Sequence, residues 1–387
     1  MKLKERNPSR TVSLVKVLPG MSAPQGGAYF EAKKGEVAEL RQLLRTVNSG
    51  NDLQRKREAI KKVIAYMTLG IDVSRLFPEM VICVETKDLV VKKMVYLYLV
   101  KYAQEHADLA LMCINTLHRD CNNEDPMVRG LALRSLCSLR LPSVVEYISE
   151  PLRKSLTDVN SYVRKTGVMG ILKLRNLAPA VVAESNLVDL LYDMIRDPDG
   201  GVVANCIMVL NEILLSEGGM AINQPIIHHL LGRMNDFNEW GLHQVLELLS
   251  RYSPADDQEV FNIMNTLDPV LRTTNSGVVL ATIKAFIHLT TSMTHIHRQL
   301  YERIKVPMLT LLAGNVDELV FCILKHIELL VVRCPGIFDA EYKHFYTKFD
   351  GALSSIVTSR LNQIQAFFIS MNVTTVFSLL AKQNRST

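Results

Sequence analysis

The sequence lacks any apolar run long enough to cross a bilayer. A spanning helix needs about 20 apolar residues, and the longest candidates, near residues 202–215 and 321–332, are interrupted by polar and charged side chains. The 7 cysteines are odd in number and include no Cys-x-x-Cys pair, which fits no disulfide framework and favours a reducing, intracellular compartment. Only 19 glycines and 14 prolines occur, too few for a collagen or a low-complexity chain.

Signatures of catalysis and of metal binding are missing as well. There is no glycine-rich phosphate loop with a lysine, no Gly-x-Ser-x-Gly and no His-Glu-x-x-His. His228 and His229 would point about 100° apart on a helix. No cysteine or carboxylate cluster lies at zinc spacing beside them, or beside His295 and His297. We therefore predict a protein that is not an enzyme, with no catalytic residue, metal site or cofactor.

Apolar residues make up 48% and charged residues 21% of the 387 positions, an ordinary globular composition that can fill a large core. The net charge of +5 is unevenly placed. Residues 1–62 carry 14 Lys and Arg against 6 Asp and Glu, whereas the remainder carries 30 against 33. This asymmetry indicates that the N-terminal end meets something anionic, for which a membrane surface, a nucleic acid and an acidic partner are all candidates.

Helical periodicity runs through most of the chain. Residues 17–30 are punctuated by proline and glycine and are typical of a loop. From Lys33 onward, apolar residues recur with a helical period, and the first stripe comprises Val37, Leu40, Leu43 and Leu44. The period persists to about residue 348, and alternating strand patterns are nearly absent. The sequence therefore predicts an all-α fold.

A polar loop followed by an apolar helix recurs at a spacing close to 40 residues. Its markers are Val91, Val128, Val163, Val203, Trp240, Val279 and Val320, with steps of 37, 35, 40, 37, 39 and 41. These periods are typical of HEAT and armadillo repeats, in which each helix pair stacks on its neighbours to bury a continuous core. We predict a right-handed α-solenoid, a superhelix of this type.

The loop residues suit the starts of the predicted helices. Asp125 and Asn160 can accept from the first free backbone N–H groups, and Pro126 fits a first-turn position that needs no N–H. Several cations follow closely behind, and we expect them to brace the layers between repeats, or to cover these layers with their stems, rather than to bind ligands. These cations are Arg129, Arg134, Arg140, Arg164 and Lys165.

Long blocks of this sequence resemble the first repeats of a beta-adaptin. They include Gly35-Glu-Val-Ala-Glu-Leu, Lys56-Arg-Glu-Ala-Ile-Lys-Lys-Val-Ile-Ala-Tyr-Met, Lys92-Lys-Met-Val-Tyr-Leu-Tyr-Leu and Arg129-Gly-Leu-Ala-Leu-Arg-Ser-Leu-Cys. The blocks Asp236-Phe-Asn-Glu-Trp and Leu289-Thr-Thr-Ser-Met-Thr-His-Ile-His-Arg-Gln-Leu-Tyr look most like the beta subunit of adaptor protein complex 4. The resemblance covers roughly residues 33–348 without a large gap.

The resemblance divides the chain into three parts. Residues 1–32 form a basic N-terminal tail, residues 33–348 form the N-terminal part of an adaptin trunk, and residues 349–387 form a divergent C-terminal tail. In the tail, acidic residues vanish after Asp350 and no repeat loop follows. We therefore interpret the chain as truncated relative to a full beta-adaptin.

The resemblance also implies a function and a set of partners. It implies a non-enzymatic subunit of a heterotetrameric adaptor complex, with an epsilon-type large chain, a medium chain and a small chain. Such a complex would sort cargo into vesicles during intracellular protein transport. It would lie on the cytoplasmic side of the trans-Golgi network, held peripherally by an Arf-type GTPase and an acidic membrane.

Two candidate binding sites follow from the resemblance. A basic set in the first two predicted helices would meet acidic phosphoinositide headgroups, since each cation near a membrane contributes about 1 kcal/mol. This set is Lys33, Lys34, Arg55, Lys56, Arg57, Lys61 and Lys62. A helix predicted over 108–117 would dock the GTPase through Leu111 and Ile114, three apart on one face, although both residues also suit a core.

Other classes of protein remain compatible with a helical repeat. A transport-receptor solenoid often carries an inner ladder with several tryptophans, and this chain has only Trp240. A nucleic-acid binder would interleave aromatic residues with the basic set, which has only Tyr66 at its edge; we therefore predict no nucleic-acid partner. A soluble scaffold and a fragment without activity of its own are the further alternatives.

Overall fold

The computed structural model describes residues 36–50, 52–314, 316–334, 336–338 and 340–341. Within these residues every regular element is a helix, which confirms the all-α prediction. None of the described helices is long and apolar enough to span a membrane. The chain divides into two compact units, residues 1–73 and 74–387, and each is described by itself.

The first unit contains α1 (Glu36–Ser49) and α2 (Leu53–Thr68), which pack against each other. Asp52 begins α2 by accepting hydrogen bonds from the backbone N–H groups of Gln54 and Arg55, both at 3.1 Å. Of the predicted apolar stripe, Leu40 and Leu44 are buried, whereas Leu43 is 37% exposed. Residues four apart lie one turn above each other, so the i, i+4 pair forms the buried seam and Leu43 lies at its side.

The second unit is a succession of α-helices joined by short turns. Its α-helices are α3 (Phe77–Ile82), α4 (Leu89–Tyr102), α5 (Ala107–Leu111), α6 (Ile114–Cys121), α7 (Pro126–Leu136), α8 (Val145–Leu156), α9 (Ser161–Leu177), α10 (Pro179–Ala183), α11 (Leu187–Asp193), α12 (Gly200–Ile213), α13 (Gln224–Leu231), α14 (Glu239–Leu249), α15 (Asp257–Leu267), α16 (Ser276–Leu289), α17 (His297–Leu312) and α18 (Asp317–Arg333). The 3-10 turns among them are η1 (Ser74–Leu76), η2 (Pro142–Val144), η3 (Met194–Arg196), η4 (Leu215–Glu217), η5 (Met234–Asp236), η6 (Asp268–Arg272) and η7 (Thr294–Ile296).

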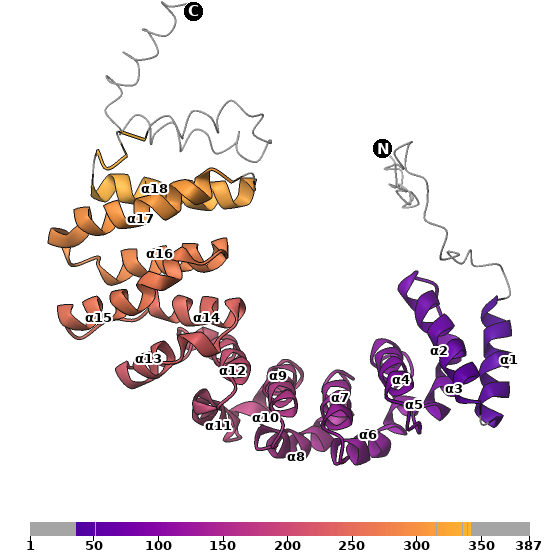
Figure 1. Ribbon diagram of the computed structural model, residues 1–387. Coiled ribbons are helices and arrows are strands. Elements are labelled where there is room, and N and C mark those ends of the chain that lie inside the picture. Colours follow the sequence, from indigo (N-terminus) through magenta and orange to yellow (C-terminus); the bar gives the residue numbers. More distant parts are fainter. Residues whose placement is uncertain (1–35, 51, 315, 335, 339, 342–387) are drawn as a thin grey trace, which may run out of the picture. The chain divides into compact units, whose positions relative to one another are not determined.

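These helices form two layers, as Figure 1 shows along the second unit. In the first layer each helix packs on the next, in the order α4, α7, α9, α12, α14, α16 and α18. The second layer supplies each of them with a partner, in the pairs α3–α4, α6–α7, α8–α9, α11–α12, α13–α14, α15–α16 and α17–α18. This stacking of helix pairs confirms the predicted HEAT/armadillo-type α-solenoid.

Helix N-caps recur at the same place in successive pairs. The side chains of six loop residues accept backbone N–H groups at the start of the first-layer helices from α4 to α16. These residues are Asp88, Asp125, Asn160, Asp199, Asn238 and Asn275. Pro126 opens α7 at its first turn, as predicted. Each cap starts its helix at a defined residue and so sets which positions enter the core.

The repeat markers are buried, with one exception. Val91, Val163 and Val203 are at most 2% exposed, whereas Trp240 is 82% exposed. Trp240 therefore marks the repeat spacing but does not enter the core. Asn238 caps α14, which places Gly241 at the buried position; a Cβ there would lie 3.0 Å from the Phe237 ring.

An arginine ladder, made of Arg129, Asp158, Arg164 and Asp197, ties one repeat to the next. The Arg129 guanidinium donates from Nε and Nη2 to the Asp158 carboxylate, at 2.8 Å each. Arg164 repeats the pattern on Asp197 at 2.7 and 2.9 Å. The Nη1 group of each arginine donates to two backbone carbonyls of the loop before its own helix. Each arginine side chain therefore closes the loop before its own helix and also holds the loop of the next repeat.

The aspartates of the ladder also organise their loops. Oδ1 of Asp158 accepts the Asn160 backbone N–H, and Oδ1 of Asp197 accepts that of Asp199, both at 2.8 Å. Burial acts to raise the pKa of Asp158, but the hydrogen bonds from Arg129 and Asn160 outweigh it and hold that pKa below its ordinary value. The Asp158 carboxylate thus remains charged, and both aspartates order the turns that lead into the next N-caps.

Three of the five cations make the bracing contacts that the sequence predicts. Arg129 and Arg164 form the ladder, and Lys165 pairs with Asp199 at 2.9 Å. Arg134 and Arg140 are exposed and make no side-chain hydrogen bond or ion pair within the described residues. They lie at the far end of α7, beyond reach of the capping loops, so spacing along the helix alone could not separate them from the others.

A buried ion pair joins α4 to α6. The Lys92 ammonium and the Tyr96 hydroxyl both donate to Oδ2 of Asp120. Lys92 is 6% and Asp120 4% exposed. Burial, and then the carboxylate, raise the pKa of Tyr96 and keep its hydroxyl protonated as a donor. The charge of Lys92 is therefore internal to the fold, and Asp120 is its counter-charge.

The arginine ladder predicts the stability of an Arg164→Gln variant. The substitution leaves the Asp197 carboxylate, 7% exposed, without its counter-charge. We expect the free energy of unfolding of the second unit to fall by about 3 kcal/mol, measured by urea denaturation at neutral pH. Arg164→Lys should recover only part of the loss, since an ammonium cannot fork onto both carboxylate oxygens.

Arg153→Gln is the matched control for this measurement. Arg153 lies exposed on α8 and has no side-chain partner within the described residues. Its loss should change the free energy of unfolding by less than about 0.5 kcal/mol. Equal stabilities for Arg164→Gln and Arg153→Gln would show that the ladder does not hold the repeats together.

Candidate interaction surfaces

The basic set of the first unit lies on α2, as far as the structure describes it. Arg55, Lys61 and Lys62 are exposed, and Lys56 and Arg57 are half-buried. Arg55 pairs with Asp52 at 3.3 Å, and both side chains are more than half exposed, so the pair contributes little. Lys33 and Lys34, the other two members predicted from the sequence, lie outside the described residues.

Helix geometry divides these cations into two groups. Arg57 and Lys61 are four residues apart, so they are neighbours on one side of α2. Lys62 is seven residues after Arg55 and returns near it, two turns along the helix. The cations therefore surround the solvent side of α2 as a broad positive surface. Such a surface suits a diffuse anionic partner better than one defined anion.

The proposed GTPase-docking segment is not one helix. The sequence predicted a continuous helix over 108–117, whereas α5 ends at Leu111 and α6 begins at Ile114. The break arises where the Cys113 backbone N–H bonds to the Ala110 carbonyl at 3.1 Å, a tighter i to i−3 bond. The prediction of a single helix was therefore wrong.

The break changes which residues of this segment face solvent. Leu111 is half-buried and Ile114 is 4% exposed. Met112, between the two helices, is 68% exposed. The sequence reading missed Met112, because on a continuous helix it would point about 100° away from Leu111. Its flexible thioether gives the α5–α6 junction an adaptable apolar contact.

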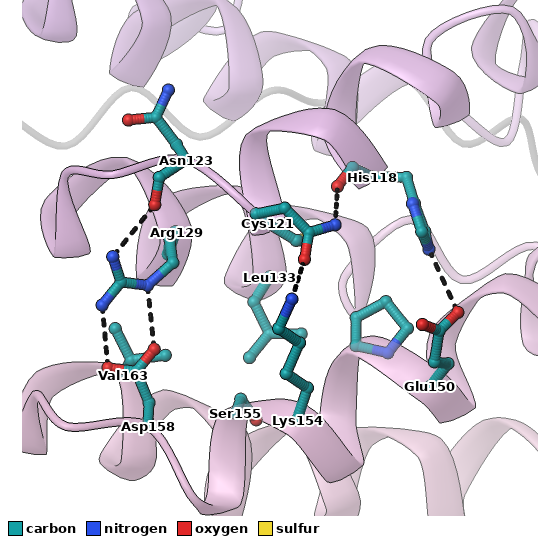
Figure 2. Close-up of a pocket in the computed structure, with 12 residues that line it drawn as sticks. His118, Cys121, Asn123, Arg129, Leu133, Glu150, Lys154, Ser155, Asp158 and Val163 are labelled. Atoms are coloured by element: carbon teal, nitrogen blue, oxygen red, sulfur yellow. Dashed lines mark hydrogen bonds and ion pairs between the residues drawn. The ribbon is translucent and has the colours of Figure 1, made fainter.

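A polar crevice of about 250 Å³ lies between the α6–α7 and α8–α9 pairs (Figure 2). His118 on α6 faces Glu150 on α8 at 3.7 Å, and Lys154 on α8 bonds to the Asn122 side chain. Arg129 closes one end with its bond to Asp158, as Figure 2 shows. Because these charged and polar groups point at one another across the crevice, it acts as a joint between repeats.

A second polar joint surrounds Glu259, which is 5% exposed. Its carboxylate accepts from the Tyr252 hydroxyl at 2.6 Å and the Ala255 backbone N–H at 2.7 Å, and it lies 2.9 Å from Nε2 of His228. Burial acts to raise the pKa of Glu259, but these hydrogen bonds, led by that of Tyr252, outweigh it and lower that pKa. His228 is thus tied to a structural carboxylate.

The cysteines are free throughout, and four of the seven are buried. Burial raises the pKa of the Cys137 and Cys206 thiols to about 12, so these thiols stay protonated and behave as small apolar groups. Among the described residues no group of three His, Cys, Asp or Glu side chains is placed to hold a metal ion.

Within the described residues, pairs of opposite charges hold neighbouring helices together. Several other cations and a few apolar side chains, such as Met112, are exposed to solvent. Residues 32–384 match the family described as Adaptin N terminal region. This chain belongs to the adaptin N-terminal family. The match extends beyond residue 348, where the sequence predicted a divergent tail, and residues 342–387 lie outside the described residues.

Two beta-type relatives are similar to this adaptin. It is 47% identical over 343 residues to Beta-adaptin-like protein A of Arabidopsis thaliana, covering 86% of this chain and 40% of that protein. It is 44% identical over 313 residues to AP-4 complex subunit beta-1 of Mus musculus, covering 81% of this chain and 42% of that protein. The resemblance to beta-adaptins is confirmed, and the adaptin spans about two fifths of the length of these relatives.

The fold has a structural neighbour in another adaptor assembly. The adaptin matches a chain of a homology model of the full-length AP-3 complex in an intermediate open conformation, with a TM-score of 0.57 and 20% identity. The match covers 90% of this adaptin and 61% of that chain. At this level of identity the likeness concerns the α-solenoid alone.

The Glu259 joint makes the stability of the adaptin sensitive to acid. Because the pKa of Glu259 is lowered by folding, its stabilisation is present above the unfolded value of about 4.3 and is lost as pH falls through the folded value. Glu259→Gln should lower the free energy of unfolding by about 2 kcal/mol at pH 7. The difference in the free energy of unfolding between this variant and the unmodified chain should narrow as pH falls below about 4.

Urea denaturation at about pH 7, 4 and 3 measures this difference in the free energy of unfolding, with Glu184→Gln as the control. Glu184 is exposed and has no side-chain partner within the described residues. A gap for Glu259→Gln that stayed constant across these pH values would contradict a structural carboxylate with a lowered pKa.

Proposed function

We propose that this adaptin is a trunk segment of the beta subunit of a heterotetrameric adaptor complex, of the AP-4 type, that sorts cargo into transport vesicles. The observation that carries this proposal is the 44% identity to AP-4 complex subunit beta-1 on a chain that folds as stacked helix pairs. The role is that of a non-enzymatic coat scaffold, because stacked repeats provide long binding surfaces. Its partners are the epsilon-type large chain, the medium chain and the small chain.

The proposed location is the cytoplasmic side of the trans-Golgi network, where the complex is peripheral to the membrane. The cations of α2, together with Lys33 and Lys34, form the surface for acidic headgroups. Five of them lie on one helix, and the Lys61 and Lys62 side chains are exposed. Attraction of about 1 kcal/mol for each such cation gives reversible rather than permanent membrane binding.

The α5–α6 junction is the proposed docking point for an Arf-type GTPase. Leu111 is half-buried there and Met112 is 68% exposed, so these two side chains offer the apolar contact. Ile114 is buried and supports the surface from beneath. Burial of an exposed methionine contributes about 1.5 to 3 kcal/mol, enough to matter in a weak, regulated contact.

Co-expression with the epsilon-type large, medium and small chains tests the scaffold role. We expect a pull-down on the small chain to recover this adaptin, and size-exclusion chromatography to give one species holding the four chains. The matched control replaces the large chain by that of an AP-1 complex, which should recover less of it. Failure with the AP-4 partners, when a full-length relative succeeds in parallel, would contradict assembly by this segment.

Flotation on phosphatidylinositol-phosphate vesicles carrying a GTP-loaded Arf-type GTPase tests recruitment. Lys61→Gln with Lys62→Gln should weaken binding to vesicles without GTPase by about thirtyfold, as two cations of about 1 kcal/mol each are lost. Met112→Asp should remove only the additional vesicle binding that the GTP-loaded GTPase provides. Met127→Asp, at an exposed methionine on α7, is the control for Met112. Equal effects of the two aspartates would exclude docking at the α5–α6 junction.

A further inference from the structure

Three cations gather where α7 and α9 end, and they take no part in the arginine ladder. We call Arg134, Arg140 and Lys173 the α7–α9 cation cluster. Arg134 lies in the last turn of α7, Arg140 lies in the turn that follows, and Lys173 lies on α9, which packs on α7. Arg134 and Arg140 are exposed, and Lys173 is half-buried.

Lys173 is held in place by hydrogen bonds. Its ammonium donates to the Ser138 hydroxyl at 2.6 Å, and that hydroxyl donates in turn to the Arg134 carbonyl at 2.6 Å. An ammonium has three N–H donors, and the remaining two make no bond within the described residues. A half-buried cation is thus oriented by the fold while most of its donor capacity is unused.

The surroundings of Lys173 disfavour its positive charge. Burial lowers the pKa of Lys173, and Arg134 and Arg140 lower it further. The nearby Cys137 thiol is the other group that acts on it, and no carboxylate does. In the ladder, by contrast, Arg129 and Arg164 each meet an aspartate. The cluster is therefore an uncompensated positive site that an anion would stabilise.

The backbone at Arg140 is a second sign of function. Arg140 has a φ of 56°, and among the described residues it is the one residue other than glycine with a positive φ. Side chains other than glycine rarely adopt this region, and where they do so the strain tends to mark a functional site. The turn therefore carries a guanidinium at a position that glycine would fill without strain.

The helix dipole explains only part of this arrangement. Cations are favoured in the last turn of a helix, and Arg134 is in such a turn. Arg140 comes after the helix has ended, and Lys173 precedes the last turn of α9. Two of the three charges thus require another explanation.

We propose that the α7–α9 cation cluster binds an acidic segment of a partner protein, seating a carboxylate or phosphoserine side chain against Lys173 with Arg134 and Arg140 forking onto it. Paired arginines suit planar or tetrahedral anions because they donate two parallel N–H bonds. The site goes beyond the proposed coat function, since it requires neither a membrane nor the other subunits.

A peptide fits this site better than a membrane or a nucleic acid does. Lys173 is half-buried on α9, which packs on α7, so a projecting side chain reaches its ammonium more readily than a flat headgroup surface does. Residues 134–141 and 170–177 contain no aromatic side chain on which a base could stack. An extended acidic segment provides both the reach and the charge.

Fluorescence anisotropy with the full chain tests the proposal. The probe is a fluorescein-labelled peptide with one phosphoserine between glutamates, and the comparison peptide carries serine and glutamines instead. We expect the acidic peptide alone to bind. Arg140→Gly should weaken binding about tenfold, the value of one charge-assisted hydrogen bond, without lowering the thermal midpoint, because glycine relieves the positive φ.

A triple variant with matched charge completes the test. Arg134→Gln, Arg140→Gln and Lys173→Gln together should abolish binding. Arg153→Gln, Arg196→Gln and Arg298→Gln together, at three exposed arginines without described partners, should retain it. Equal losses in both triple variants would overturn the site, since net charge alone would then explain binding.

Two further experiments distinguish binding of an acidic peptide from binding of other anions. Inorganic phosphate should compete only at concentrations far above that of the peptide; displacement at equal concentration would overturn a peptide site. Vesicles of phosphatidylserine should bind the cluster variant and the unmodified chain equally. A loss of vesicle binding together with retained peptide binding would assign the cluster to a membrane instead and overturn the proposal.

Discussion

The middle of the second unit depends on two inter-repeat loops, each of which is held by an arginine from the repeat before it. Arg129 closes its own loop through two backbone carbonyls and fixes the next loop through Asp158, and Arg164 continues the pattern on Asp197. Because the same aspartates order the turns that precede the N-caps, the ladder sets the residue at which the following first-layer helices begin. Stacked repeats contact only their neighbours, so a defined register between neighbours is what makes a continuous core.

This use of charge explains why so few polar features of the second unit point to ligands. The crevice of Figure 2, the Glu259 joint and the Lys92–Asp120 pair all bring opposite or complementary groups together across a helix–helix contact. Buried polar groups that are fully paired specify how elements meet, and they leave no capacity for a ligand. The groups that stand apart are those without such partners, chiefly the α7–α9 cation cluster and the exposed Met112.

The proposed coat role requires contacts with several partners, and the described residues offer a different chemistry for each proposed contact. The broad positive surface of α2 suits a diffuse anionic membrane, the apolar α5–α6 junction suits a protein contact, and the α7–α9 cluster suits a defined anionic group. Weak contacts of this kind gain strength when one chain makes several of them at once.

The sequence by itself determined the elements of this adaptin. Helical periodicity, Asp125 and Asn160 as caps, Pro126 in the first turn and the repeat near 40 residues are local patterns, and each was confirmed. Tertiary structure decided which charges meet and which side chains face solvent. Arg129 and Arg134 look alike in the sequence, yet only Arg129 finds a carboxylate, and that carboxylate is 29 residues away. Trp240 lies next to the buried position, and Met112 is exposed because a helix breaks there. Such outcomes depend on how helices that are distant in the sequence pack together. The spacing of residues along the chain does not reveal that packing.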